Sequence, residues 1–330
     1  MRKVILVVVA AAIVWSGYWF VGAAALDRGI DAALDELRAE GWRIEAADRG
    51  ISGFPNRFDT SFDALEIQAP DGDRLTMPFF QILALSYKPN EIIAIFPPEI
   101  SLDRGGQVVR LTNEDARGSV TFRTSPDLPL DHSAFVIEDL LIESDGIDFS
   151  MDELRFATRI PPGAPDARHQ NIGLSATGIV LPEQIGRRIE ATGLGPIEVL
   201  RVDATLDFAA PIDRHALGNQ PRIDKIDLHD LALDWGGIGL DGEGLIEIGA
   251  DGLPMGDIDL TLENVDRAIE VAVAAGLIPG NRAAMITQGL SFLGGSGTEG
   301  RVTLPLRFAD GDMMLGPIPL GPAPRIGVGR

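Results

Sequence analysis

Residues 200–208 read LRVDATLDF, with an apolar side chain at every second position and a polar one between. A period of two is typical of a β-strand that turns one face to an apolar core and the other to water. The same alternation recurs over Ile238–Ile248, Ile258–Leu262 and Val302–Phe308. The intervals between such runs are too short for helical crossovers, which predicts antiparallel pairing.

Turn signals separate the runs. Asp-Gly occurs at Asp71, Asp145, Asp241, Asp251 and Asp310. Apolar runs flank all of these except Asp241, as hairpin turns require. Asp241-Gly242 falls inside a run and predicts a bend or bulge. We therefore expect a mainly β chain, built on a long curved antiparallel sheet that is open or half-closed, with a few short helices.

The helical signals are few. Residues 182–192 could form a short helix begun by Pro182, and Asn264 could cap a helix over 265–275. A further helix is predicted over 281–293. The last two segments are unusually apolar, so we expect them to cover an opening of the sheet.

The N-terminus predicts a membrane span. Val4–Leu26 carries no charge and follows a basic pair, and its 23 residues can cross roughly 30 Å of hydrocarbon as a helix. Trp15, Tyr18 and Trp19 cluster away from the basic pair, as interfacial anchors do. Residues 1–26 are therefore predicted to be a single-pass membrane anchor, with the N-terminus in the cytoplasm and the rest of the chain outside it.

A cleaved signal peptide is the competing interpretation, because Val4–Val14 has the length of a signal core and Ala23–Ala25 satisfies the cleavage rule. Both interpretations export the rest of the chain. Residues 27–41 carry a stripe of apolar residues at helical spacing, which indicates a juxtamembrane amphipathic helix. The stripe could form a stalk at the membrane, or it could pack on the exported β-rich domain predicted over 42–330.

Composition excludes several classes of function. The 330 residues are 45% hydrophobic and 23% charged, as in globular proteins. The net charge of −21 would repel a phosphate backbone, so no nucleic-acid partner is expected. The chain has no cysteine, which excludes disulfides, thiol nucleophiles and Cys-ligated metals.

The sequence contains a weak internal repeat, in which an aspartate lies between two successive runs of alternating apolar residues. These aspartates are Asp63, Asp139 and Asp230. Repeated sheet units explain it, and so do independent bulges in one sheet.

No catalytic motif is complete. The four histidines are His132, His169, His215 and His229, and none has metal-ligand spacing, which favours surface or capping roles. Ser291 follows Gly289-Leu290 but precedes Phe292-Leu293, so the nucleophile-elbow motif is incomplete. A serine hydrolase whose catalytic residues come from distant parts of the sequence is a remaining alternative.

Gly236–Asp241 matches the first six positions of a calcium-binding nonapeptide repeat, in which carbonyls and the Asp supply oxygen ligands. Ile238 and Leu240 also fit the alternation of a strand, which is the favoured interpretation. We expect no catalytic residue, no metal and no cofactor.

Several passages carry a family resemblance. They are Ser52–Asp59, Leu233–Gly236, Asp251–Gly256, Leu262–Asn264 and Ala309–Leu320. They resemble the bacterial envelope family known as domain of unknown function 2125, which is also similar to AsmA-like proteins. The resemblance implies an inner-membrane protein with a curved antiparallel sheet facing the periplasm, and the AsmA-like similarity suggests lipid handling or envelope assembly by analogy.

The leading hypothesis is a non-enzymatic, inner-membrane-anchored periplasmic protein that holds lipid or another apolar ligand on a curved sheet, in envelope maintenance. The first alternative is a structural or interaction module of the envelope without a ligand, whose partners would be other envelope proteins. The second is an envelope hydrolase of unknown substrate.

Overall fold

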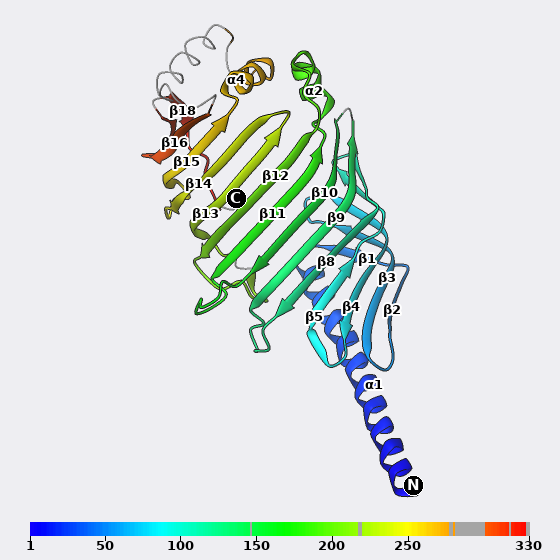
Figure 1. Ribbon diagram of the computed structural model, residues 1–330. Helices are drawn as coiled ribbons and strands as arrows, with labels where there is room; N and C mark the ends of the chain where they lie inside the picture. The colour runs from blue at the N-terminus through cyan, green and yellow to red at the C-terminus, as the bar shows by residue number, and fades with distance from the viewer. Residues whose placement is uncertain (146, 217–219, 277–279, 281–300, 317, 328–330) are drawn as a thin grey trace. The chain divides into compact units, whose positions relative to one another are not determined.

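The computed structural model describes residues 1–145, 147–216, 220–276, 280, 301–316 and 318–327. The chain divides into two compact units. Unit 1 comprises Met1–Thr121 and Leu141–Asp145, and unit 2 comprises Phe122–Leu140 and Gly146–Arg330. Each unit is built on antiparallel strands (Figure 1).

Unit 1 combines a long helix with short hairpins. Its elements are α1 (Arg2–Ala39), β1 (Arg43–Glu45), β2 (Asp48–Ser52), β3 (Arg57–Gln68), β4 (Arg74–Leu85), β5 (Lys88–Ile95), β6 (Glu99–Arg104), β7 (Gln107–Thr112) and β8 (Asp115–Phe122). Strand β3 pairs with β1 and β2 along one edge and with β4 along the other. Strand β4 pairs with β5 and β6, β5 with β8, and β6 with β7.

Helix α1 unites the predicted anchor and the predicted juxtamembrane helix in one element, which ends at Ala39. From the apolar stripe, Ile30 packs against the unit 1 core cluster of Phe62, Leu65 and Met77. At Ile30 the stripe therefore packs on the β-rich part that follows it, as one of the two interpretations predicted, whereas Leu37 near the end of the helix is exposed.

Unit 2 is a meander in which each strand pairs with the next. Its strands are β9 (Leu130–Ser144, whose residues from Leu141 on belong to unit 1), β10 (Ile147–Arg159), β11 (His169–Ile179), β12 (Ile197–Phe208), β13 (Ile223–Trp235), β14 (Ile238–Ile248), β15 (Pro254–Glu263), β16 (Arg301–Ala309), β17 (Asp312–Leu315) and β18 (Ile318–Pro322). The pairings are antiparallel. The mainly β antiparallel class is confirmed, as are the hairpin turns at Asp71, Asp251 and Asp310. The turn predicted at Asp145-Gly146 includes a residue outside the described ones.

The bulge predicted at Asp241 lies instead on the neighbouring strand. Two register shifts coincide on β13: the pairing with β12 leaves His229 as the extra residue, and the pairing with β14 sets His229 and Asp230 opposite the single residue Glu243. Leu228 and Leu231 are three positions apart, so they would face opposite sides of a regular strand. With the extra residue, both align with apolar residues of β12, namely Ala204 and Val202. Of the two explanations for the internal repeat, a local bulge applies at this place.

Register divides the unit 2 sheet into two faces, because residues directly opposite one another share a face. On one side of the sheet, large apolar side chains form rows that cross the strands, and we call this side the apolar face. These side chains are Leu154, Phe156, Ile172, Leu174, Leu200, Val202, Leu206, Leu228, Leu231 and Leu233. The large side chains of this face are half-buried, whereas the alanine Ala204 between them is 1% exposed. The alternation that the sequence predicted over 200–208 is confirmed.

The helices of unit 2, and Ala323 after β18, pack on strands β14 and β16. Helices α2 (Glu183–Ile189), η1 (Glu190–Thr192) and α4 (Val265–Ala274) confirm the predicted helices after Pro182 and Asn264. They bury two clusters, Ile189, Ile238 and Val271 in one and Val265, Ile269, Val302 and Leu304 in the other. Ala323 of the tail packs with Ile246, Ile248 and Phe308. The helix predicted over 281–293 lies outside the described residues.

The division into faces predicts opposite outcomes for two adjacent substitutions. Ala204→Asp places an unpaired charge in a buried position and should destabilise unit 2 by about 3 kcal/mol or more. Asp203→Asn lies on the polar face and should leave the melting temperature nearly unchanged. Thermal unfolding followed by circular dichroism measures both. Equal melting temperatures for the two variants would show that the strand phase is wrong.

Candidate functional site

Three aromatic residues of α1 fasten this helix to two loops of unit 1. The indole Nε1 of Trp15 donates to the carbonyl of Pro55 (3.1 Å), the phenol of Tyr18 to that of Ser86 (2.6 Å), and the indole of Trp19 to that of Arg57 (2.7 Å). The acceptors lie in the β2–β3 loop, residues 53–56, at Arg57, the first residue of β3, and in the β4–β5 turn, residues 86–87. The aromatic group that the sequence assigned to a membrane interface therefore also binds protein.

Ring packing reinforces these hydrogen bonds. Trp19 is 7% exposed and meets Phe54 edge-on, with ring centroids 5.4 Å apart, and Phe58 at 6.0 Å. Phe20 stacks on Phe54 at 5.6 Å. A β-carbon on Gly22 would come within 2.6 Å of Phe58 Cζ, so glycine lets the ring approach the helix. We call Trp15, Tyr18, Trp19, Phe54 and Phe58, with the loop carbonyls that they contact, the aromatic clamp.

The part of α1 before the clamp presents apolar side chains without protein cover. Val4, Leu6 and Val8 are each more than half exposed, for example. The helix is long enough and apolar enough to cross a membrane. It is therefore consistent with a single-pass anchor, in agreement with the span that the sequence predicts.

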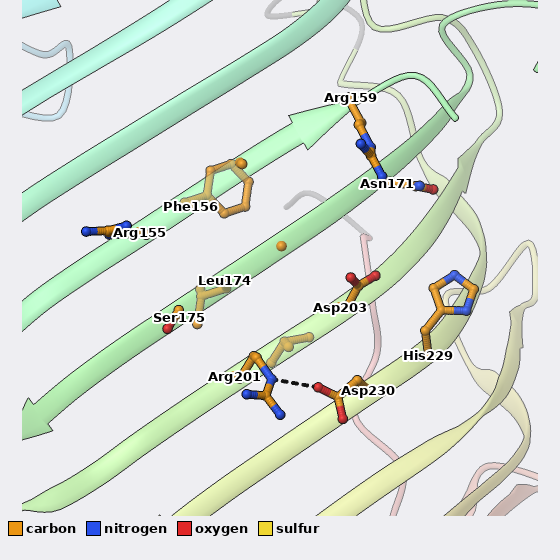
Figure 2. A pocket seen from close by; sticks show the side chains of 13 residues that line it. Arg155, Phe156, Arg159, Asn171, Leu174, Ser175, Arg201, Asp203, His229 and Asp230 are labelled. Atoms are coloured by element: carbon orange, nitrogen blue, oxygen red, sulfur yellow. Dashed lines mark hydrogen bonds and ion pairs between the residues drawn. The ribbon is translucent and has the colours of Figure 1, made fainter. Parts of the chain in front are cut away.

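On the opposite face of the unit 2 sheet from the apolar one, the register forms a shallow polar hollow of about 620 Å³ (Figure 2). Ala157, Gly173 and Asp203 stand side by side on β10, β11 and β12 and form its floor. The floor is low because two of these residues have little or no side chain. A row of Arg155, Ser175 and Arg201 bounds one side, and Arg159, Asn171 and Thr205 form the next row on the other.

Ion pairs fix two of the three arginines around this polar hollow. Arg201 Nε lies 2.7 Å from Asp230 Oδ2, the dashed contact of Figure 2, and Arg155 Nη2 lies 2.6 Å from Glu153 Oε2. The hydrogen bonds that the two guanidinium groups donate to these carboxylates raise the pKa of Arg201 and of Arg155. Arg159 forms no ion pair with the described part of the chain.

A hydrogen-bonded chain crosses three strands at the edge of the polar hollow. The Thr205 hydroxyl lies 2.8 Å from Asn171 Oδ1 and 2.8 Å from His229 Nε2. A hydroxyl has one proton, and it goes to the Asn171 carbonyl oxygen, which accepts only. His229 Nε2 must then carry the proton that the Thr205 oxygen accepts. The bulge on β13 brings the imidazole to this position.

The other predicted residues do not converge on one place. His132 Nδ1 contacts Asp131 (3.0 Å), His169 Nδ1 contacts Asp207 (2.6 Å), and His215 Nε2 accepts from Arg214 Nε (3.1 Å). The hydrogen bond from His132, followed by that from Arg123, lowers the pKa of Asp131. No serine is hydrogen-bonded to a histidine within the described ranges, and Ser291 lies outside them.

The glycines of the calcium-like motif form the β13–β14 turn. Gly236 and Gly237 have φ of 55° and 82°, which favours glycine. The Glu198 carboxylate accepts a hydrogen bond from the backbone N–H of Gly236 at 2.9 Å. Ile238 and Leu240 continue into β14, so the strand interpretation is confirmed. In the described ranges, no three His, Asp or Glu side chains are grouped so as to hold a metal ion.

Trp19 donates a hydrogen bond to the carbonyl of Arg57, so trypsin cleavage of the Arg57–Phe58 peptide bond reports on whether the aromatic clamp is closed. Trp19→Ala should cost about 3 kcal/mol of local stability, since it removes a buried ring and a hydrogen bond. Trypsin should then cleave after Arg57 faster by one to two orders of magnitude where local opening limits cleavage. The full chain in detergent and mass spectrometry of the fragments test this. Val21→Ala, at an exposed position of α1, is the control, and a rate equal to that of this control would refute the clamp.

The hydrogen-bonded chain predicts a fixed histidine tautomer. Thr205→Val removes the acceptor for His229 Nε2 and should cost about 1 kcal/mol. The ring nitrogen shifts of His229, measured by NMR on histidine-labelled protein at a pH where the ring is neutral, should lose their bias toward the Nε2–H form. Ser175→Ala, on the same face, should leave them unchanged. Identical shifts in wild type and Thr205→Val would contradict the assignment.

Comparison with family sequences identifies one match, described as "Uncharacterized protein conserved in bacteria (DUF2125)", over residues 19–324. Curated proteins and solved structures give no match. The matched range begins at Trp19 of the aromatic clamp and includes the strands of both units. Because it covers most of the sequence, the chain belongs to the DUF2125 family of bacterial proteins.

Proposed function

We propose that the chain is a non-enzymatic protein of the bacterial cell envelope, which α1 anchors in the inner membrane, and that the apolar face of unit 2 holds the acyl chain of a lipid. The basic pair at positions 2 and 3 favours a cytoplasmic N-terminus. The body of the protein then lies in the periplasm, beside a source of lipid.

The proposal rests on the partial exposure of the large side chains of the apolar face. Its side chains are aliphatic apart from Phe156, and they stay half-buried although they lie in the middle of a sheet. Ile226 stands opposite Leu206 on the same face and packs against the cluster of Ile246, Ile248, Phe308 and Ala323, whereas none of the side chains that define the apolar face belongs to the buried clusters of the described strands. Covering such a surface with an acyl chain is favourable by roughly 0.8 kcal/mol for each buried methylene group.

The two faces of the sheet would have different roles. The polar face carries arginines, carboxylates and the hydrogen-bonded chain, and it suits contact with water. The side chains that define the apolar face carry no charge. The polar residues that the register places beside them are Thr158 and Gln170, and both are hydrogen-bonded within the protein. We expect this face to select mainly by shape and apolar area. The AsmA-like similarity drawn from the sequence points toward lipid handling as well, by analogy.

Adjacent residues on β11 provide a matched test. The photoreactive amino acid p-benzoylphenylalanine is placed at Leu174, on the apolar face, or at Ser175, on the polar face, in the full chain. Cells grown with radiolabelled phosphate are irradiated, and the purified protein is examined for labelled lipid. We expect a phospholipid adduct at Leu174 and none at Ser175.

The same experiment separates the alternatives. A protein adduct at Leu174 in place of a lipid would favour the interaction module. Equal lipid labelling at both positions, or none at either, would overturn the proposal that this face holds lipid.

A further inference from the structure

The two loops gripped by the aromatic clamp expose aromatic rings beside the membrane helix. Phe54 is 52% exposed, Tyr87 is 57% exposed, and Phe20 of α1 is 63% exposed. Phe54 lies in the β2–β3 loop and Tyr87 in the β4–β5 turn, and these loops lie alongside α1 in unit 1 (Figure 1). Exposed aromatic rings next to a span are typical of a membrane interface.

The length of α1 places these loops below the surface of a bilayer. A helix rises about 1.5 Å per residue, and the hydrocarbon layer is about 30 Å thick. If the basic pair at positions 2 and 3 stays at one surface, the opposite boundary falls about 20 residues later, near Ala23. Trp15 and Trp19 then lie roughly 12 Å and 6 Å inside that boundary, together with the loops that they bind. A tilted helix would place the loops deeper still.

Backbone polar groups in hydrocarbon need hydrogen-bond partners from the protein. For the two loops, these partners come from α1 and from the loops themselves. The carbonyls of Pro55, Arg57 and Ser86 accept hydrogen bonds from the rings of α1. The Ser86 N–H donates to the carbonyl of Asn56 at 2.8 Å. The Gly53 carbonyl accepts from the N–H groups of Asn56 (3.2 Å) and Arg57 (2.9 Å). The Pro55 carbonyl also accepts from the Ser86 hydroxyl at 3.4 Å, so the hydrogen bonds from α1 add to those between the two loops.

The nearest charges are paired and stand at the ends of the strands. Arg57 Nε contacts Asp59 Oδ1 at 2.9 Å, and Lys88 Nζ contacts Glu91 Oε1 at 2.8 Å. The Arg57 and Lys88 side chains are about half exposed. Long basic side chains at this position reach the phosphate groups of lipids while their stems stay in the apolar layer.

From these observations we infer that the β2–β3 loop and the β4–β5 turn insert the rings of Phe54 and Tyr87 into the bilayer leaflet next to the body of the protein. The inference rests on the proposed anchoring by α1. The insertion gives unit 1 three attachment points in the membrane, the helix and the two loops, and so fixes its tilt against the bilayer.

The absence of cysteine from the chain allows a clean test by single-cysteine labelling. The variants Phe54→Cys and Tyr87→Cys, each in the full chain, carry the fluorophore NBD in liposomes of phosphatidylethanolamine and phosphatidylglycerol. Val8→Cys, in the free part of α1, reports on the anchor. Pro70→Cys lies at the far end of β3 and β4, roughly 40 Å away along a strand of this length, and reports on water.

We expect the labels at 54 and 87 to be quenched by doxyl lipids, as the label at 8 is. Their quenching by aqueous iodide should be several-fold weaker than that of the label at 70. Iodide quenching at 54 and 87 equal to that at 70, with position 8 still protected, would overturn loop insertion and leave the anchor intact. Iodide quenching at position 8 would overturn the anchor, and loop insertion with it. Because Tyr87 makes no ring contact with α1 among the described residues, its label tests insertion without weakening the clamp.

Discussion

Continuous antiparallel register is the constraint on which unit 2 depends. Each strand alternates apolar and polar side chains, and the faces agree across the sheet only while the pairing stays in phase. The extra residue His229 keeps that phase on β13, because it lets Leu228 and Leu231 share the apolar face with Ala204 and Val202. The same residue brings an imidazole to the hydrogen-bonded chain on the polar face. One local irregularity therefore serves both sides of the sheet.

Unit 1 solves a different problem, which is to hold a membrane helix against a β-sheet. Ring nitrogens and a phenol of α1 supply donors to loop carbonyls, so binding the helix and satisfying the loop backbone are the same event. Gly22 permits the closest approach, at Phe58. In this arrangement the aromatic residues act as structural ligands of the loops, in addition to any role at a lipid surface.

Much of the fold follows from short-range patterns in the sequence. Alternation over 200–208, the Asp-Gly turns and the apolar N-terminal run predict strands, hairpins and α1, because each depends on neighbouring residues. The polar hollow depends on which residues of different strands stand opposite one another, and no local pattern reveals that Arg155, Ser175 and Arg201 align. The aromatic clamp is equally hidden, since its hydrogen bonds join residues 38 to 68 positions apart. The change of alternation at Asp230, with Leu228 and Leu231 three positions apart, was the visible sign of the bulge.

The division of β9 between the two units has a consequence for how the chain folds as it is synthesised. Residues 110–112 of β7 pair with Leu141–Glu143 of β9, which are the last part of unit 1 to emerge. Until then, β7 keeps that part of its edge open, and unpaired edges recruit other strands. A stretch of the second unit, Phe122–Leu140, emerges during this interval. Unit 1 can therefore be completed only after residues 122–140 of unit 2 have been synthesised, which couples the folding order of the two units.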